Sequence, residues 1–227
     1  MILEFILENS YAEYAGQIYK QTKGIPQGNN ASPQIADLTL SFMEYDYIKK
    51  TITIEHPLAL RLGKTFRYMD DIIHVSDETD QFIQLCTSMY HESLTLERTN
   101  SHLRQAKFLD LEIEIDNNMK MRTKLFNKTD EYDFRIVRYP HIESEIPQRI
   151  GLNTHYGESI RIYRNCTEYE DFLTRINQLS QTYRNNGYHK NQIAQMLFKI
   201  IGRNPNIATK YRKDSWQIAT SAVSNLQ

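Results

Sequence analysis

The stretch that decides the fold is FRYMDDIIHV, residues 66–75, where Asp70 and Asp71 stand side by side between apolar runs. The β-branched residues after the acids favour a strand, so the stretch predicts a β-hairpin with the acids at its tip. Aspartate is common in solvated turns. Two adjacent carboxylates also suit a divalent cation such as Mg²⁺ or Mn²⁺, which binds hard oxygen ligands. This stretch alone leaves both interpretations open.

The composition is that of an ordinary globular chain: 227 residues, 40% hydrophobic and 24% charged. No apolar run approaches the ~20 residues that span a bilayer, so we expect no membrane partner. The opening MILEFILENSYAEY lacks a basic region before its apolar residues and predicts an amphipathic helix over 2–10, not a signal peptide. Cys86 and Cys166 form neither a disulfide framework nor a zinc motif. This favours an intracellular protein, nuclear or cytoplasmic.

Charge is distributed unevenly although the net charge is only −1. Residues 140–227 carry 11 Lys/Arg and 7 Asp/Glu, or +4, whereas residues 1–139 carry 16 and 21, or −5. A basic C-terminal part suits contact with a polyanion. Chance variation on solvated faces gives the same numbers, so charge does not decide the function.

Hydrophobic periodicity predicts an α+β part over 1–138 and a helical part over 139–227 that ends in a loose tail. In the helical part, Thr167 opens a helix as a capping box with Glu170, and Gly187 ends that helix. Gly202 is expected to end the next one. In the α+β part, helices are expected over 32–50, with Ser32 as N-cap, and over 78–93. Strands are expected over 17–22, 58–69, 71–77, 94–99, 107–118 and 119–126, with a tight turn at Asn117–Asn118.

A second motif is the Gly-rich loop GIPQGNNASP, residues 24–33. Gly24 and Gly28 remove side chains on either side of Pro26–Gln27, which lets the backbone approach a ligand or a neighbouring strand closely. The helix that begins at Ser32 points its free N–H groups into the same space, which favours phosphate. No Walker-type lysine follows, so a nucleotide P-loop is not supported. A plain strand–turn–helix connector stays open as well.

Together the two motifs resemble the palm of reverse transcriptases. GIPQGNNASPQIADLTLSFMEYD (24–46) resembles the family's loop-plus-helix motif, and YMDD (68–71) resembles its metal-binding hairpin. AKFLDLEIEID (106–116), RYPHIESEIP (138–147) and NNGYHKNQI (185–193) resemble segments of Penelope-like retroelements. The resemblance implies a right-hand polymerase palm, with an antiparallel sheet and helices, followed by a helical thumb. It also implies RNA-directed DNA polymerase activity.

The resemblance assigns the catalytic site as well. It implies that Mg²⁺ or Mn²⁺ is held by Asp70 as main ligand and Asp71 as supporting acid, and that the partners are an RNA template, a DNA primer and dNTP. In this reading Tyr68 lies near the primer terminus and Met69 packs the turn. The residues implied to bind substrate are Pro26, Gln27, Gly28, Tyr68 and Met69.

One element that the resemblance requires has no counterpart in the sequence. The family's metal site needs a further Asp on a strand before the Gly-rich loop, and no acid before Gly24 lies in such a strand. We therefore expect the fingers and first palm strand to be absent, either lost or supplied by another chain. Polymerase activity of these 227 residues alone is expected to be weak or nil.

Four arginines of the helical part are expected to follow the template–primer backbone through phosphate contacts. They are Arg161, Arg164, Arg175 and Arg184. A solubilising face is the other reading of the same residues. Two rival functions also stay open. One is a non-catalytic nucleic-acid-binding module with a helix-turn-helix pair around NNGY, and the other is a protein-interaction domain with incidental acids.

Overall fold

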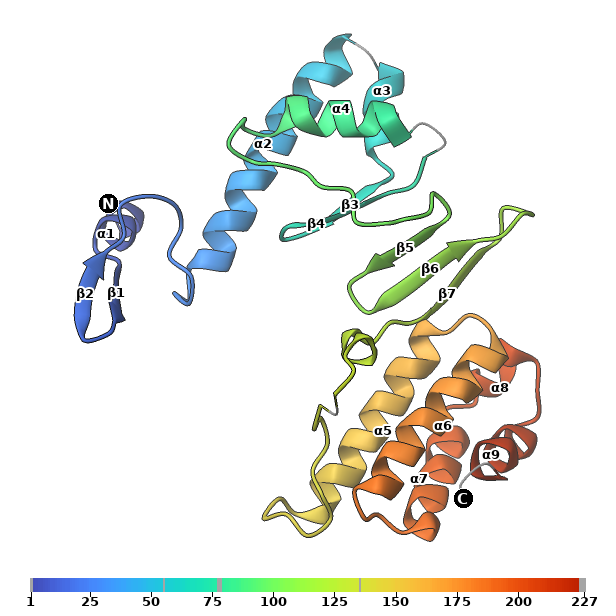
Figure 1. Ribbon diagram of the computed structural model, residues 1–227. Coiled ribbons are helices and arrows are strands. Elements are labelled where there is room, and N and C mark those ends of the chain that lie inside the picture. The colour runs from blue at the N-terminus through green and yellow to red at the C-terminus, as the bar shows by residue number, and fades with distance from the viewer. Residues whose placement is uncertain (1, 55, 77–78, 135, 225–227) are drawn as a thin grey trace. The chain divides into compact units, whose positions relative to one another are not determined.

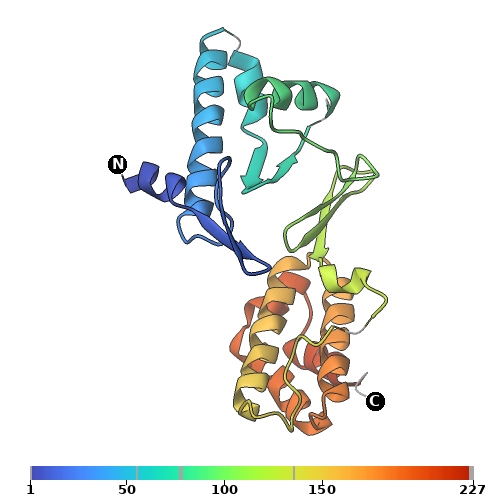
Figure 2. The same cartoon turned by 60° about the vertical axis from the view of Figure 1, so that its left-hand side comes forward.

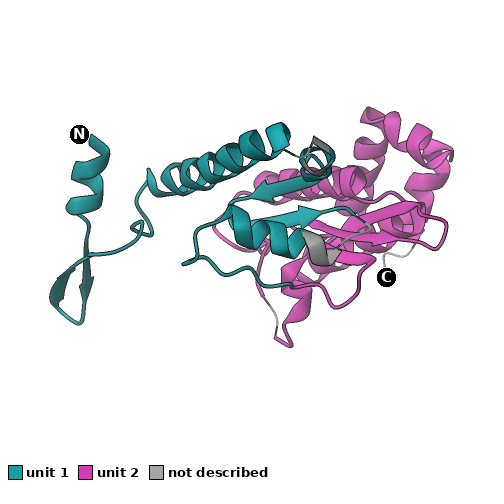
Figure 3. Ribbon diagram, turned by 90° about the horizontal axis from the view of Figure 1, so that it is seen from above, with its two compact units in different colours: residues 1–98 teal, residues 99–227 magenta. Residues whose placement is uncertain are grey.

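The computed structural model describes residues 2–54, 56–76, 79–134 and 136–224, which form an α+β fold of helices and small antiparallel sheets (Figure 1). The chain divides into two compact units, residues 1–98 and 99–227 (Figure 3). This division comes well before residue 138, where the sequence predicted the change from mixed to helical structure. Among the described residues, no helix combines the length and the apolar character needed to cross a membrane.

The first unit consists of short elements around one long helix. Most expected elements are present here, including the helix near the N-terminus and the strand that begins at Gln17. The bounds are α1 Ile2–Glu8, β1 Tyr11–Tyr14, β2 Gln17–Lys20, α2 Ser32–Ile54, α3 His56–Leu62, β3 Thr65–Tyr68, β4 Asp71–His74 and α4 Thr79–Met89. β1 pairs with β2 and β3 with β4, each as a two-stranded antiparallel hairpin.

Two strand predictions in this unit are wrong. Residues 58–62 lie in helix α3, because Pro57 suits a first helical turn, Leu and Ala favour helix, and Gly63 follows the helix end. Residues 94–99 form no strand. Their alternation meets no neighbouring strand among the described residues, and an unpaired strand leaves its backbone hydrogen bonds unmade. The start of the predicted helix 78–93 includes residue 78, which lies outside the described residues.

The start of helix α2 differs in detail from the prediction. Ser32 is the first helical residue, and Ala31 precedes it with its carbonyl accepting from the N–H of Ile35 at 3.0 Å. The Ser32 hydroxyl donates to the carbonyl of Pro26, so it fastens the loop and does not cap the helix. Asn29 forms a turn just before the helix, since its Oδ1 accepts from the N–H of Ala31 at 2.9 Å.

The second unit combines a three-stranded sheet with a helical bundle. The sheet order is β5-β6-β7, with Phe108 opposite Leu111 and Ile115 opposite Met121. The turn predicted at Asn117–Asn118 is a longer loop. The N–H of Asp116 donates to the carbonyl of Lys120 at 3.0 Å and closes this loop. The bounds are β5 Gln105–Phe108, β6 Leu111–Ile115, β7 Met121–Leu125, the 3-10 helix η1 Lys128–Glu131, α5 Gln148–Asn165, α6 Tyr169–Asn185, α7 Lys190–Arg203, α8 Asn206–Tyr211 and α9 Ser215–Ser224.

Helices α5, α6 and α7 lie side by side and enclose the main core (Figures 1 and 2). Nineteen of the 21 buried hydrophobic residues in the described chain belong to this unit. The core also joins two segments that the sequence set apart, YP at 139–140 and NNGY at 185–188. Asn186 donates its side-chain N–H to the carbonyl of Tyr139 at 3.0 Å, and the Tyr183 ring lies 5.0 Å from both the Tyr139 and Tyr188 rings.

Three predictions about helix ends meet different outcomes. Gly187 follows α6 with φ +88°, as expected for a glycine just past a helix end. Thr167 forms no capping box, because its hydroxyl and backbone N–H bond to the backbone of Thr123 on β7. Gly202 lies inside α7, which continues to Arg203. The expected loose tail is helix α9 as far as Ser224, and residues 225–227 lie outside the described residues.

Candidate functional site

The acidic pair lies at the tip of the β3–β4 hairpin, as predicted. Tyr68 pairs with Asp71, so Met69 and Asp70 form a two-residue turn. Met69 has φ +54°, a conformation that costs a non-glycine residue about 1 kcal/mol or more. All four residues of the YMDD sequence are exposed. The turn therefore presents both carboxylates to solvent on a short, strained connection.

Arg67 fixes this hairpin to helix α2. Its side chain is only 9% exposed, and its Nε donates to Glu44 Oε1 at 2.5 Å while Nη1 donates to Asp37 Oδ1 at 2.8 Å. Nη1 also donates to the carbonyl of Met69 at 3.1 Å, which links the same guanidinium to the turn. The hydrogen bond to Glu44 raises the pKa of Arg67 above its ordinary value, against the lowering effect of burial. The arginine is therefore a permanent cation that holds the turn in place.

The acids of α2 are consequently engaged elsewhere. Glu44 also accepts from the hydroxyl of Tyr90 at 2.6 Å, and burial together with this bond raises the pKa of that phenol. Asp46 pairs with Lys50 at 2.6 Å, and Asp37 pairs with Arg67 at 2.8 Å. Two of the three acids of α2, Asp37 and Glu44, thus hold the hairpin through Arg67.

Asp70 and Asp71 differ from these acids. Across the part of the chain that the structure describes, neither carboxylate has an ion pair or a hydrogen bond. Exposed, adjacent and unpaired carboxylates match the oxygen donors that Mg²⁺ and Mn²⁺ prefer. The described residues contain no group of three or more His, Cys, Asp or Glu side chains arranged to hold a metal ion. The two carboxylates alone therefore fall short of such a group.

The Gly-rich loop presents its predicted substrate residues unequally. Pro26 is buried and accepts from Ser32, whereas Gln27 and Gly28 are exposed. Gly28 has φ +87°, so the backbone at this point requires a glycine, while the space beside it is open. Among the described residues, no hydrogen bond joins residues 26–28 to residues 68–71. The grouping of these two segments into one site therefore stays a prediction.

The four predicted nucleic-acid-binding arginines lie in different environments. Arg161 binds the Asp110 carboxylate through Nη2 at 2.7 Å and Nε at 2.9 Å, and it also pairs with Glu158. Arg184 donates to the carbonyl of Tyr188 at 3.2 Å. Arg164 is exposed at the end of α5 and has no ion pair with a described residue. Contact with phosphate stays a prediction for these arginines, and Arg161 would have to exchange its existing partners to make one.

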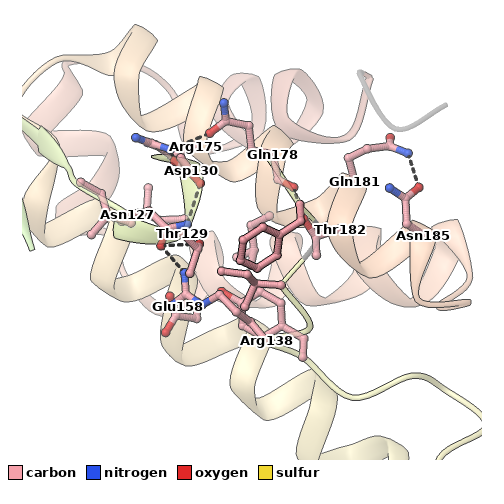
Figure 4. Close-up of a pocket in the computed structure, with 16 residues that line it drawn as sticks. Asn127, Thr129, Asp130, Arg138, Glu158, Arg175, Gln178, Gln181, Thr182 and Asn185 are labelled. Atoms are coloured by element: carbon pink, nitrogen blue, oxygen red, sulfur yellow. Dashed lines mark hydrogen bonds and ion pairs between the residues drawn. The ribbon is translucent and has the colours of Figure 1, made fainter. Parts of the chain in front are cut away.

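Arg175 lines a cavity of about 540 Å³ between the segment 127–139 and helices α5 and α6 (Figure 4). Its Nη1 binds Asp130 at 2.5 Å and Gln178 at 3.0 Å. Arg138, on the other side of the cavity, donates to Asn127 at 2.5 Å. The arginine thus ties the connecting segment to α6, which gives it a structural role that the sequence did not indicate.

Sequence reasoning also missed Arg67, the residue that positions the hairpin. A single arginine inside a four-residue strand gives no signal by itself. The available clue is its place one residue before YMDD, together with acids spaced seven apart on the preceding helix, which lie on one helical face.

Comparison with models of known protein families gives no match for this chain, and comparisons with curated proteins and with solved structures also give none.

Proposed function

We propose that the β3–β4 hairpin is the metal-binding turn of a reverse transcriptase palm and that the chain takes part in nucleotidyl transfer on a primer–template. The observation that carries this proposal is the pair Asp70–Asp71, exposed and without a partner among the described residues, on a turn that a buried arginine holds in place. The resemblance of YMDD and the Gly-rich loop to that family supports the same function.

The two carboxylates would hold Mg²⁺ or Mn²⁺ through their oxygens. Bound cations in such a site neutralise the charge on the attacking 3′-oxygen of a primer and on the leaving pyrophosphate. The contribution of the chain is to keep both acids at a fixed place, since Arg67 binds α2 and the turn carbonyl of Met69 at once. Tyr68, exposed beside the acids, would lie near the primer terminus, and Met69 would pack the turn that carries them.

Exposed apolar side chains on the first unit form a surface that a further polypeptide segment would cover. Along α2, one line of large side chains stays exposed at intervals of three, four or seven residues, so it follows a single helical face. Exposed apolar patches of this kind mark interaction surfaces in soluble proteins. The line consists of Leu38, Phe42, Tyr45 and Ile52. A polypeptide segment that adds a palm strand bearing a carboxylate, from this protein or from another chain, would cover it and complete the set of ligands.

Binding of Mn²⁺ to the 227-residue chain tests the site directly. We expect a weak site, with affinity lowered at least tenfold by Asp70→Asn and unchanged by Asp110→Asn, whose acid lies on a similar turn but pairs with Arg161. Equal Mn²⁺ affinity in the wild type and Asp70→Asn would remove the basis for the catalytic site.

Primer extension on an RNA template with a DNA primer tests the activity. We expect little or no dNTP incorporation by this chain alone, because two carboxylates orient the cations poorly. Robust incorporation would show that no further ligand is needed. The alternative, a non-catalytic nucleic-acid-binding module built on α6 and α7, predicts hybrid binding that neither Mn²⁺ nor Asp70→Asn affects.

A further inference from the structure

The chain contains a long stretch without acids at its C-terminal end. From residue 172 to 213 it carries eight Lys/Arg and no Asp/Glu, and this stretch spans most of α6 and all of α7 and α8. Lys199, Arg203 and Arg212 are exposed there, and no carboxylate of the described residues pairs with them. These cations differ from Arg161 and Arg175, whose charges are already balanced by ion pairs.

An exposed aromatic pair includes Phe198, the residue that precedes Lys199. The rings of Phe198 on α7 and Trp216 on α9 are 5.5 Å apart, and Trp216 is 66% exposed. Asp214 fixes the start of α9, because its Oδ1 accepts from the backbone N–H of Trp216 at 2.8 Å. The backbone that carries the indole is therefore fixed, and much of the indole surface is open to solvent. Exposed aromatic rings among positively charged side chains act as stacking platforms for nucleobases.

Helix α7 provides a continuous path past this pair. Its inner face is buried through Ile193, Leu197 and Ile200. The opposite face is exposed and contains no acid and no bulky aliphatic side chain, and a side chain added at Gly202 would meet open space. The helical period places the residues of this exposed face next to one another along the axis. They are Asn191, Gln195, Phe198, Lys199 and Gly202, and Arg203 lies one helical turn after Lys199 at the flank of this face.

We propose that Phe198, Lys199, Arg203 and Trp216, here called the α7–α9 face, bind single-stranded nucleic acid. A base stacks on Trp216 against the support of Phe198, and the two cations contact flanking phosphates. The side-chain amides of Asn191 and Gln195 add hydrogen-bonding groups that do not select a particular base. The choice of nucleic acid rests on the proposed function, because the unbalanced positive charge alone would also suit an acidic polypeptide.

Trp216 is the only tryptophan in the chain, so its fluorescence reports on this face alone. We expect titration of the 227-residue chain with an oligo-dT strand to quench the fluorescence, with an affinity that falls as salt rises. In an anisotropy assay with a labelled strand, Trp216→Ala is expected to weaken binding roughly 5- to 150-fold, the loss typical of one stacked base. Trp216→Phe should recover part of this loss, which excludes simple misfolding.

Lys199→Gln is expected to weaken binding a few-fold and to lower the salt slope by about 0.7, the value for one phosphate contact on a single strand. Matched controls come from the first unit: Tyr14→Ala removes an aromatic ring that is 76% exposed, and Lys50→Gln removes a lysine paired with Asp46. Both controls should bind the strand like the wild type.

The outcomes separate this inference from the proposed function. Asp70→Asn should leave the quenching of Trp216 unchanged, so loss of the metal site and loss of strand binding can be observed independently. Wild-type affinity in Trp216→Ala would overturn the inference whatever the result with Mn²⁺. Equally tight binding of polyglutamate, with the same dependence on Trp216, would overturn it in favour of an acidic protein partner.

Discussion

The β3–β4 and β5–β6 hairpins have the same two-residue turn but use its aspartate differently. Each turn follows an aromatic residue, begins with an apolar residue at positive φ, +54° at Met69 and +53° at Leu109, and continues with an aspartate. Asp110 in the second turn binds Arg161 with both oxygens. Asp70 in the first has no such partner among the described residues. The comparison shows that turn geometry does not explain why the first hairpin keeps two unpaired acids.

The arginines near the two turns reverse their roles. Arg67 lies in the hairpin and reaches out to acids of a helix, whereas Arg161 lies on a helix and reaches to the acid of the turn. In the first case the turn is held through the carbonyl of Met69 and its acids stay free. In the second case the acid itself is the attachment. The first arrangement suits a site that must hold a turn still and leave its carboxylates available.

The largest effect is expected from Arg67→Met. Removing a guanidinium that is 9% exposed leaves Glu44, 23% exposed, without its cation, and breaking a buried pair from one side costs at most about 3 to 5 kcal/mol. Urea unfolding should show this loss in the first unit. Arg161→Met is the matched control, with a smaller loss because that arginine is 28% exposed. Equal losses would mean that Arg67 does not anchor its hairpin more strongly.

Acid should destabilise the second unit through His155. This side chain is fully buried, its Nδ1 has no hydrogen-bond partner, and burial lowers its pKa to about 4. Above pH 6.5 the residue is neutral in both folded and unfolded chains. Below that, only the unfolded chain takes up the proton, so stability falls until pH 4, by about 3 kcal/mol in total. Unfolding of His155→Leu measured from pH 7 to 4 should lack this component. If the free energy of unfolding of His155→Leu fell with pH as steeply as that of the wild type, the acid sensitivity would belong to other groups.

The sequence predicted the elements that depend on local signals. The hairpin at YMDD, helix α2 and helix α4 follow from β-branched runs and helical spacing, and Gly187 from the positive φ of a helix end. Residues 58–62 were misjudged because alternating Leu residues suit a strand and a short helix equally well. The segment 94–99 failed because a strand requires a partner that no local pattern supplies.

The same distinction between local signals and distant contacts applies to the candidate site. Asp70 and Asp71 could be predicted from their own neighbourhood. Arg67 could not, because its role comes from contacts with residues 23 and 30 positions away in the chain. The pairing of Arg161 with Asp110 spans 51 positions, so it could not be predicted from the sequence either. Counting arginines identified basic residues but could not show that Arg161 and Arg175 are already paired with acids.

A smaller effect separates the two turn acids. Asp110→Asn should lower the free energy of unfolding by about 1 kcal/mol, because it breaks a partly exposed ion pair with two hydrogen bonds. Asp70→Asn should be neutral or slightly stabilising, since it relieves repulsion from Asp71 and breaks no described contact. Denaturant unfolding of both variants makes the comparison. A loss of similar size in Asp70→Asn would mean that this acid has a structural role after all.

The smallest effect concerns the turn residues that the hairpins share. A non-glycine residue at positive φ costs about 1 to 2 kcal/mol, and glycine removes that cost but adds about 0.5 to 1 kcal/mol of freedom to the unfolded chain. Met69→Gly and Leu109→Gly should therefore each raise the free energy of unfolding by about 0.5 kcal/mol. Because both side chains are partly exposed, at 37% and 44%, little packing is lost in either. Equal gains would show that the two backbones are equivalent, so that the difference between the hairpins lies in their acids. A gain at Leu109 alone would instead show that the Met69 side chain stabilises its own turn.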